Sequence, residues 1–142
     1  NLIANLMQCE AWFEPALHDT SRGPVPAQFV FVCALPLYHA FALVANCLFG
    51  IRLGGVNVLI ANPRDIPAFI GELKKAPFTI IVGVNTLYRA LVDAPGFREI
   101  NAGALKLALA GGMAVQRQVS ERWNVPLITG DVALEAFQPF AP

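Results

Sequence analysis

A histidine beside an aromatic residue stands where an apolar run is broken by a proline. Residues 35–41 read LPLYHAF, so that Tyr38 and His39 follow Pro36 at the end of the apolar run 29–34. In open α/β proteins, ligands bind where a strand ends and a helix begins. An imidazole at such a position can donate a hydrogen bond to a ligand or accept one from it. On the residues alone, a histidine that only ties two loops together by hydrogen bonds stays an alternative.

Two later turns also follow apolar runs and precede expected helices. The glycines of residues 111–113 (GGM) allow a close approach of the backbone to a planar ligand and place amides near a helix N-terminus. They lack the third glycine of a dinucleotide fingerprint and the lysine of a phosphate loop, and an ordinary tight turn is the alternative. Val84, Asn85 and Thr86 form the other turn, where Asn85 or Thr86 is expected to cap a helix.

Other common site chemistries have no matching pattern. The serines are Ser21 and Ser120, and neither lies in a GxSxG elbow. His18, His39 and three cysteines lack the spacing of a zinc site. We therefore assign no catalytic residue and no metal ligand from the sequence.

Four apolar runs must position these turns, and each is expected to be a buried strand. The expected strands are residues 29–34, 56–60, 78–82 and 105–109. The expected helices are residues 1–13, 40–51, 66–75, about 85–92 and a segment after residue 112 that carries Val115, Val119 and Trp123 on one face. Alternation of strand and helix predicts an α/β fold with a mostly parallel sheet, helices on both faces and right-handed crossovers.

Two local signals set helix ends. Pro15 is expected to stop the first helix near residue 13. Asp65 is expected to be the N-cap of the helix over residues 66–75, and Pro67 is tolerated in its first turn.

Composition narrows the classes of partner. The 142 residues include ten basic and ten acidic side chains, scattered without the basic patch that a nucleic-acid backbone needs. The chain is 56% hydrophobic, but no uninterrupted apolar run is long enough to span a bilayer. Cys9, Cys33 and Cys47 are an odd number without a CxxC pair, which favours reduced thiols in a cytoplasmic protein. Peripheral contact with the inner membrane face stays open.

Several motifs carry a resemblance to a known family. They are residues 35–41, 54–67 (GGVNVLIANPRDIP), 77–87 (PFTIIVGVNTL), 110–113 and 121–123. In this order and at these separations the chain resembles bacterial long-chain fatty-acid CoA ligases, members of the adenylate-forming, AMP-binding enzyme superfamily. The recognisable resemblance covers about residues 1–123, within the large N-terminal domain of such enzymes.

The resemblance implies a function and roles for the turns. The parent enzyme would activate a fatty acid with ATP to acyl-AMP and transfer it to CoA, with magnesium as a further cofactor. His39 would stand beside the reacting carboxylate, in a turn with Tyr38 that lines the acyl and adenylate pocket. Leu43 would also contact the substrate, at a position where some family members carry an aromatic gate. The turn of Val84, Asn85 and Thr86 would border the acyl site. The glycine turn of Gly111, Gly112 and Met113 would bind the substrate and also line the adenine pocket.

The last residues depart from the family pattern. Residues 124–142 do not show the expected threonine and glutamate turn that would bind phosphates and magnesium, and Glu135 is at best a distorted remnant. A phosphate-gripping loop and a C-terminal lid are not recognisable either. We therefore expect residues 1–142 to be a single incomplete domain, an excised fragment that is inactive alone and binds no cofactor tightly.

Two alternatives remain open. The chain could be a non-catalytic acyl-binding module, which would self-associate into a homo-oligomer through the exposed edges of a truncated sheet. It could also be a membrane-associated protein.

Overall fold

The computed structural model describes residues 1–21, 23–75, 77–112, 115–123 and 127–129. The strands are β1 (Val30–Cys33), β2 (Val56–Leu59), β3 (Ile80–Gly83), β4 (Leu107–Ala110) and β5 (Leu127–Thr129). The helices are α1 (Leu2–Leu17), α2 (Ala40–Ala42), the π-helix η1 (Leu43–Leu48), α3 (Phe49–Arg52), α4 (Ile66–Lys75), α5 (Asn85–Asp93), the 3₁₀-helix η2 (Phe97–Glu99) and α6 (Arg117–Trp123).

The strands form one parallel sheet in the order β2-β1-β3-β4-β5. The interior strands β3 and β4 are buried at every position, which is why their sequences are continuous apolar runs. β1 lies between β2 and β3, with Phe31 opposite Asn57 on one side and Ile80 on the other. The expected parallel α/β fold is therefore confirmed.

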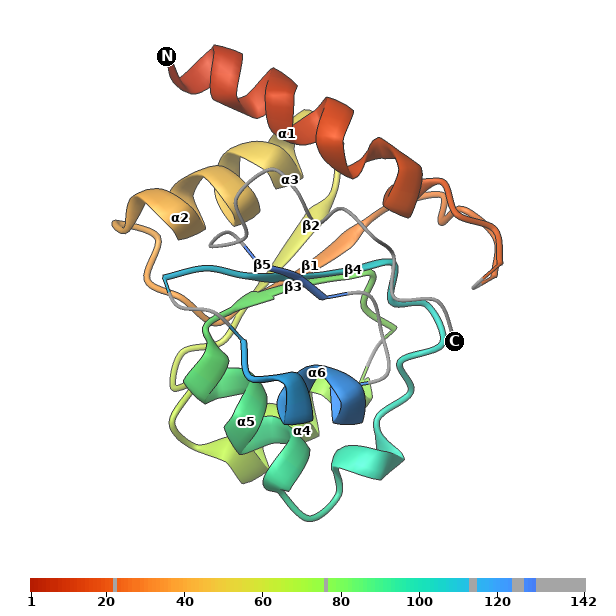
Figure 1. Cartoon of the computed structure of the whole chain (residues 1–142), viewed down its shortest axis with the longest axis vertical. Helices are drawn as coiled ribbons and strands as arrows, with labels where there is room; N and C mark the ends of the chain where they lie inside the picture. Colours follow the sequence, from red (N-terminus) through yellow and green to blue (C-terminus); the bar gives the residue numbers. More distant parts are fainter. Residues whose placement is uncertain (22, 76, 113–114, 124–126, 130–142) are drawn as a thin grey trace.

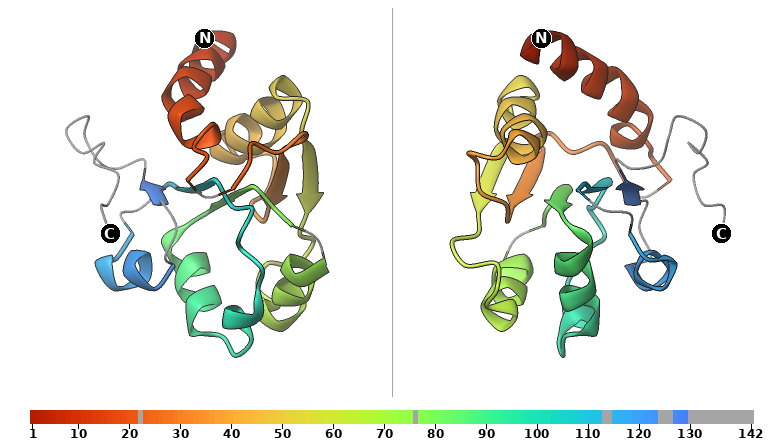
Figure 2. Two further views of the ribbon diagram at one scale, coloured as in Figure 1. Left: turned by 90° about the vertical axis from the view of Figure 1, so that its right-hand side faces the viewer. Right: turned by 60° about the vertical axis from the view of Figure 1, so that its left-hand side comes forward.

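Helices cover both faces of the sheet. Helices α1, α2 and α3 lie above it in Figure 1, and α4, α5 and α6 lie below it. The views in Figure 2 show the same two layers and place the N-terminus at the far end of α1. Each layer has its own core: Phe13, Phe31 and Phe49 pack on the α1 side, while Phe69, Tyr88 and Trp123 pack on the α4 side.

The chain changes direction across the sheet at β1. The connection from β1 to β2 runs on the upper face, whereas α4 carries the chain from β2 past β1 to β3 on the lower face. The segments that follow β1 and β3 therefore enter opposite helical layers. Open sheets bind ligands at this type of switch point.

Two expected helices differ from the sequence interpretation. α1 continues through Pro15 to Leu17, because Phe13 and Leu17 are both buried and hold its last turn against the core. The segment expected as one helix over residues 40–51 is helical throughout, but its centre Leu43–Leu48 is π-helical. Such bulges are rare and occur frequently at functional sites.

The cap of α4 gives a first prediction. Asp65 accepts a hydrogen bond from the Ala68 amide through Oδ1 at 3.1 Å, and its carbonyl accepts the Phe69 amide at 2.9 Å. We expect Asp65→Ala to lower the free energy of unfolding by about 0.5–2 kcal/mol, and Asp65→Asn to recover most of it. Urea denaturation of the three proteins measures this, and equal midpoints for the alanine variant and the wild type would contradict the cap.

Candidate functional site

The carboxyl ends of the parallel strands meet at one edge of the sheet. The ladder continues there beyond the strands: the Gly111 amide donates to the Gly83 carbonyl at 3.3 Å, and the Ile60 amide donates to the Cys33 carbonyl at 2.9 Å. The turns that follow β1, β3 and β4 are those that carry the candidate residues. The topology therefore brings the candidate turns to a common edge.

His39 and Tyr38 lie exposed at this edge, after the end of β1. The Tyr38 side chain is 83% exposed, and its ring centroid lies 4.6 Å from that of His39. The His39 backbone forms the N-cap of α2, yet its imidazole makes no hydrogen bond with any residue that the structure describes. The observed arrangement thus lacks the loop-tying hydrogen bonds of the structural alternative and leaves the imidazole open to a ligand.

Phe41 joins the histidine turn to the glycine turn. A Cβ atom built on Gly111 would lie 3.0 Å from two ring atoms of Phe41, so the two residues are in close contact. A side chain at Gly111 would therefore press on the Phe41 ring. Phe41 was not among the candidate residues, although it belongs to the LPLYHAF motif.

Leu43 and Asn46 belong to the π-helix behind this turn. The Leu43 amide donates to the His39 carbonyl at 2.9 Å, which puts the half-buried Leu43 one turn beyond the histidine as expected. Asn46 is fully buried, and its Nδ2 donates to the Val32 carbonyl at 3.3 Å. This amide holds the irregular helix against β1.

The turn after β3 differs from the expected capping arrangement. Val84, not Asn85 or Thr86, is the N-cap of α5, and no side chain completes the cap. Asn85 is buried and accepts the Gln116 amide through Oδ1 at 3.1 Å, which ties this turn to the segment before α6. Thr86 is exposed at the same edge. The capping prediction was wrong because the asparagine is used for a longer-range contact.

The glycine turn after β4 does not lead directly into a helix, contrary to the expectation from the sequence. Gly112 has a positive φ of 82°, and a Cβ there would meet nothing within 4 Å, so the backbone at this point borders open space. The next helix, α6, begins only at Arg117, so the amides of Gly111 and Gly112 are not at a helix N-terminus. Met113 lies outside the described residues.

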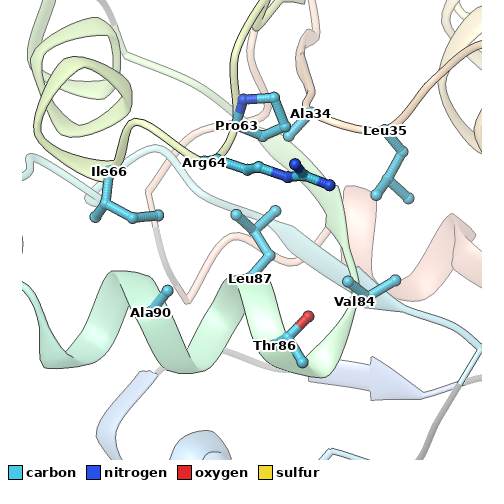
Figure 3. Close-up of a pocket in the computed structure, with 9 residues that line it drawn as sticks. All are labelled: Ala34, Leu35, Pro63, Arg64, Ile66, Val84, Thr86, Leu87 and Ala90. Atoms are coloured by element: carbon cyan, nitrogen blue, oxygen red, sulfur yellow. The ribbon is translucent and has the colours of Figure 1, made fainter.

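A hollow of about 320 Å³ opens where β1 and β3 end (Figure 3). It is lined by Ala34, Leu35, Pro63, Arg64, Ile66, Val84, Thr86, Leu87 and Ala90. Two of these, Val84 and Thr86, were predicted site residues, whereas Arg64 was missed. Arg64 lies next to the ends of β1 and β3 only because of the strand order, which the sequence pattern does not reveal.

The cysteines are free thiols, and the acidic side chains form no metal-binding cluster in the described ranges. All three cysteines are free, and burial raises the pKa of the Cys33 thiol, partly offset by its contact with the Leu35 carbonyl. Within the described ranges, no group of three His, Cys, Asp or Glu side chains could hold a metal ion.

Comparison with known proteins identifies the family. Residues 1–135 match the AMP-binding enzyme family. The chain belongs to this family. The match extends beyond residue 123, where the recognisable motifs end, and takes in the strand β5.

Several similar proteins are long-chain-fatty-acid–CoA ligases. The chain is 48% identical over 137 residues to that ligase from Escherichia coli O6:H1 and 44% identical to that from Haemophilus influenzae. In both cases the alignment covers 96% of this chain but 23% of the relative. The chain thus spans about a quarter of the length of these ligases.

Several solved structures share the fold of this chain. The inhibitor-bound N-terminal domain of FACL13 from Mycobacterium tuberculosis superposes with a TM-score of 0.67 at 17% identity, over 83% of this chain and 31% of that one. ATP-bound MatB from Rhodopseudomonas palustris also gives a TM-score of 0.67, at 20% identity, over 86% of this chain and 22% of that one. In the described part of the chain, no helix is both long and apolar enough to cross a membrane.

Proposed function

We propose that this chain is the central part of the N-terminal domain of a long-chain fatty acid–CoA ligase. The observation that carries the proposal is the 48% identity to the E. coli ligase over almost the whole chain. In the reaction, a carboxylate oxygen of the fatty acid attacks the α-phosphorus of ATP and pyrophosphate leaves. The CoA thiol then loses its proton, attacks the acyl carbon and displaces AMP.

The edge near His39 is the proposed acyl and adenylate site. The exposed imidazole has no hydrogen-bond partner among the described residues, so it is free to hydrogen-bond the carboxylate or the acyl phosphate. Phe41 and half-buried Leu43 supply an apolar wall beside it, and the open backbone at Gly112 leaves room for a planar base. Tyr38, Val84, Asn85, Thr86, Gly111 and Met113 complete the proposed binding set.

The chain supplies only part of what the reaction needs. Charge that develops on the phosphates must be stabilised by positioned cations and amides. Magnesium would accompany ATP, but the described residues contain no cluster that fits a metal ion, and we assign no step to it. We propose that the isolated chain is inactive and that it binds ATP weakly.

A chimaera tests the function. The segment is placed into the E. coli ligase in exchange for its counterpart, and acyl-CoA formation from a long-chain fatty acid, ATP and CoA is measured beside the isolated chain. We expect acyl-CoA from the chimaera and none from the isolated chain. Product from the isolated chain would overturn its inactivity, and a chimaera that unfolds cooperatively yet makes no product would overturn the function.

One observation favours the alternative of a self-associating module. β2 is an edge strand that pairs only with β1 among the described strands, and Leu59 on it is 62% exposed. Unpaired edges of this kind recruit other chains. A concentration-dependent dimer of the isolated chain, together with an inactive folded chimaera, would favour that module over the ligase.

A further inference from the structure

A buried amide interrupts the apolar face of the helix that follows His39. Helices α2, η1 and α3 are continuous, and their buried side chains are those of Ala42, Ala45, Asn46 and Phe49. Asn46 is fully buried among them, and its Oδ1 has no hydrogen-bond partner within the described residues. A buried polar atom without a partner costs stability, whereas an apolar side chain of similar shape leaves no such atom. Core packing alone therefore does not account for an asparagine at this position.

The hydrogen bond of Asn46 closes the segment that carries His39. Its Nδ2 donates to the carbonyl of Val32, 14 residues earlier in the chain. Val32 lies in β1, before the turn of Tyr38 and His39, and Asn46 lies in η1, after that turn. The bond therefore joins the two ends of the intervening segment and holds the turn relative to the sheet.

Asn46 also lies in the π-helical part of the helix. The Phe49 amide donates to the Val44 carbonyl, five residues earlier, and Asn46 stands inside this wide turn. A π-turn contains one residue more than an α-turn, and each residue of an α-helix turns the chain by about 100°. If η1 relaxed to an α-helix, the residues that precede it would rotate relative to buried Phe49. His39 and Phe41 are among those residues, so the form of η1 sets where they stand.

We propose that Asn46 is a positioning residue of the acyl and adenylate site, which keeps η1 π-helical and thereby holds the His39 turn in place. It acts through the helix, because a fully buried amide offers a substrate no surface. The unpartnered Oδ1 is the cost of placing a donor at the Val32 carbonyl, and proteins accept such local costs at functional sites. The role rests on the proposed ligase function and adds to it a residue outside the strand-end turns.

NMR of the isolated 142-residue chain tests whether Asn46 holds the turn. The reporter is the contact between the Phe41 ring and Gly111, which adjoins His39. We expect Asn46→Ala to reduce the Phe41–Gly111 cross-peak at least about twofold and to shift the backbone amides of residues 38–43. Asn46→Leu refills the space without a donor, so the same changes in this variant would assign them to the lost hydrogen bond and not to a cavity.

Asn57→Ala is the matched control for Asn46→Ala. The Asn57 Oδ1 is also buried without a partner in the described ranges, and its amide borders Gly50, further along the same continuous helix. We expect this variant to leave the reporter cross-peak and the amides of residues 38–43 unchanged. An unchanged cross-peak in both variants of Asn46, or equal changes in Asn57→Ala, would overturn the proposal.

Kinetics of the chimaeric ligase test whether the position matters for the reaction. A misplacement of about 1 Å can cost up to about 100-fold in rate, so we expect Asn46→Ala to lower kcat by about 10–100-fold and to leave KM for ATP within about twofold. Asn57→Ala should change neither constant. Thermal unfolding of each variant shows that the rates belong to folded protein. A loss of kcat no greater than that in Asn57→Ala would contradict the positioning role.

A double-mutant cycle with His39→Ala shows whether Asn46 acts through the histidine. In the His39→Ala background, Asn46→Ala should lower kcat less than about twofold, since the group that it positions is already absent. Losses that multiply instead would overturn action through His39. A chimaera without activity before any substitution would overturn the ligase function, while the NMR comparison of the isolated chain would still decide whether Asn46 holds the turn.

Discussion

Replacing Tyr88 with alanine is expected to lower the free energy of unfolding by about 3–5 kcal/mol. Tyr88 is fully buried on α5, and its ring packs edge-on against Trp123 with the ring centroids 4.9 Å apart. Its hydroxyl lies 2.7 Å from the Leu109 carbonyl and 3.1 Å from the Ile81 carbonyl, so it bonds to the backbone of two strands. The truncation removes the ring from the core below the sheet and leaves these carbonyls short of a donor.

The variant Tyr88→Phe separates the contribution of the hydroxyl to stability from that of the ring. We expect Tyr88→Phe to cost about 1–3 kcal/mol, since only a buried hydrogen-bonding group is removed. Tyr38→Phe is the matched control, because Tyr38 is 83% exposed and its loss of a hydroxyl should change stability by less than about 0.5 kcal/mol. Urea denaturation measures all of these variants. Equal stability of Tyr88→Phe and Tyr38→Phe would show that the Tyr88 hydroxyl is not engaged in the fold.

The same hydroxyl predicts a dependence on pH. Burial raises the pKa of Tyr88 well above the ordinary value of 10.0, although the hydrogen bond with Leu109 partly offsets it. Above pH 10 the unfolded chain therefore loses this proton while the folded chain keeps it, and stability falls as pH rises. The stability difference between wild type and Tyr88→Phe should be constant below pH 10 and shrink above it. The cysteine thiols are common to both proteins, so they cancel in this difference, and a constant difference up to pH 11 would contradict the prediction.

Gly111→Val is expected to have the largest effect on activity. Its Cβ would stand 3.0 Å from the Phe41 ring, so the ring must give by a few tenths of an ångström, and the γ-methyl groups of valine crowd it further. A displacement of about 1 Å at a reacting centre can cost about 100-fold in rate, and we expect kcat/KM of the chimaeric ligase to fall by about 10–100-fold. Steady-state acyl-CoA formation measures this.

Two further variants test the cause of that loss. Gly71 lies in α4, where a Cβ would meet nothing within 4 Å, so Gly71→Val should leave kcat/KM unchanged. Adding Phe41→Ala to Gly111→Val removes the crowding, and we expect the double variant to regain the thermal stability that the single variant loses, though not the apolar wall. A comparable loss of activity in Gly71→Val would show that crowding at Phe41 is not the cause.

The strands and most helices could be predicted because each has a strong local signal. Apolar runs marked β1 to β4 within one or two residues, and the Asp65 cap set the start of α4. α1 was predicted too short because the burial of Leu17 is a tertiary effect that outweighs the local rule for Pro15. No sequence signal marked the π-helix. It is associated with a tertiary contact, the buried hydrogen bond between Asn46 and Val32, which a local pattern does not show.

The candidate site was predictable only in part. The turn residues could be found because strand ends and glycine pairs are visible in sequence. The Phe41–Gly111 contact and the place of Arg64 beside β3 depend on the strand order β2-β1-β3-β4, which no local pattern encodes. Buried Lys106 shows the same limit: its Nζ donates to the carbonyls of Asp19 and Gly23, far away in sequence.

The proposed acyl and adenylate site requires the β1 and β4 turns to converge at one edge of the sheet. Nuclear Overhauser contacts between the Phe41 ring protons and the Gly111 α-protons in the 142-residue chain measure this convergence directly. We predict strong cross-peaks, because the two residues are in van der Waals contact. If the spectrum resolves both groups and no cross-peak joins them, the turns do not share a site, and the proposed acyl and adenylate pocket does not exist in this form.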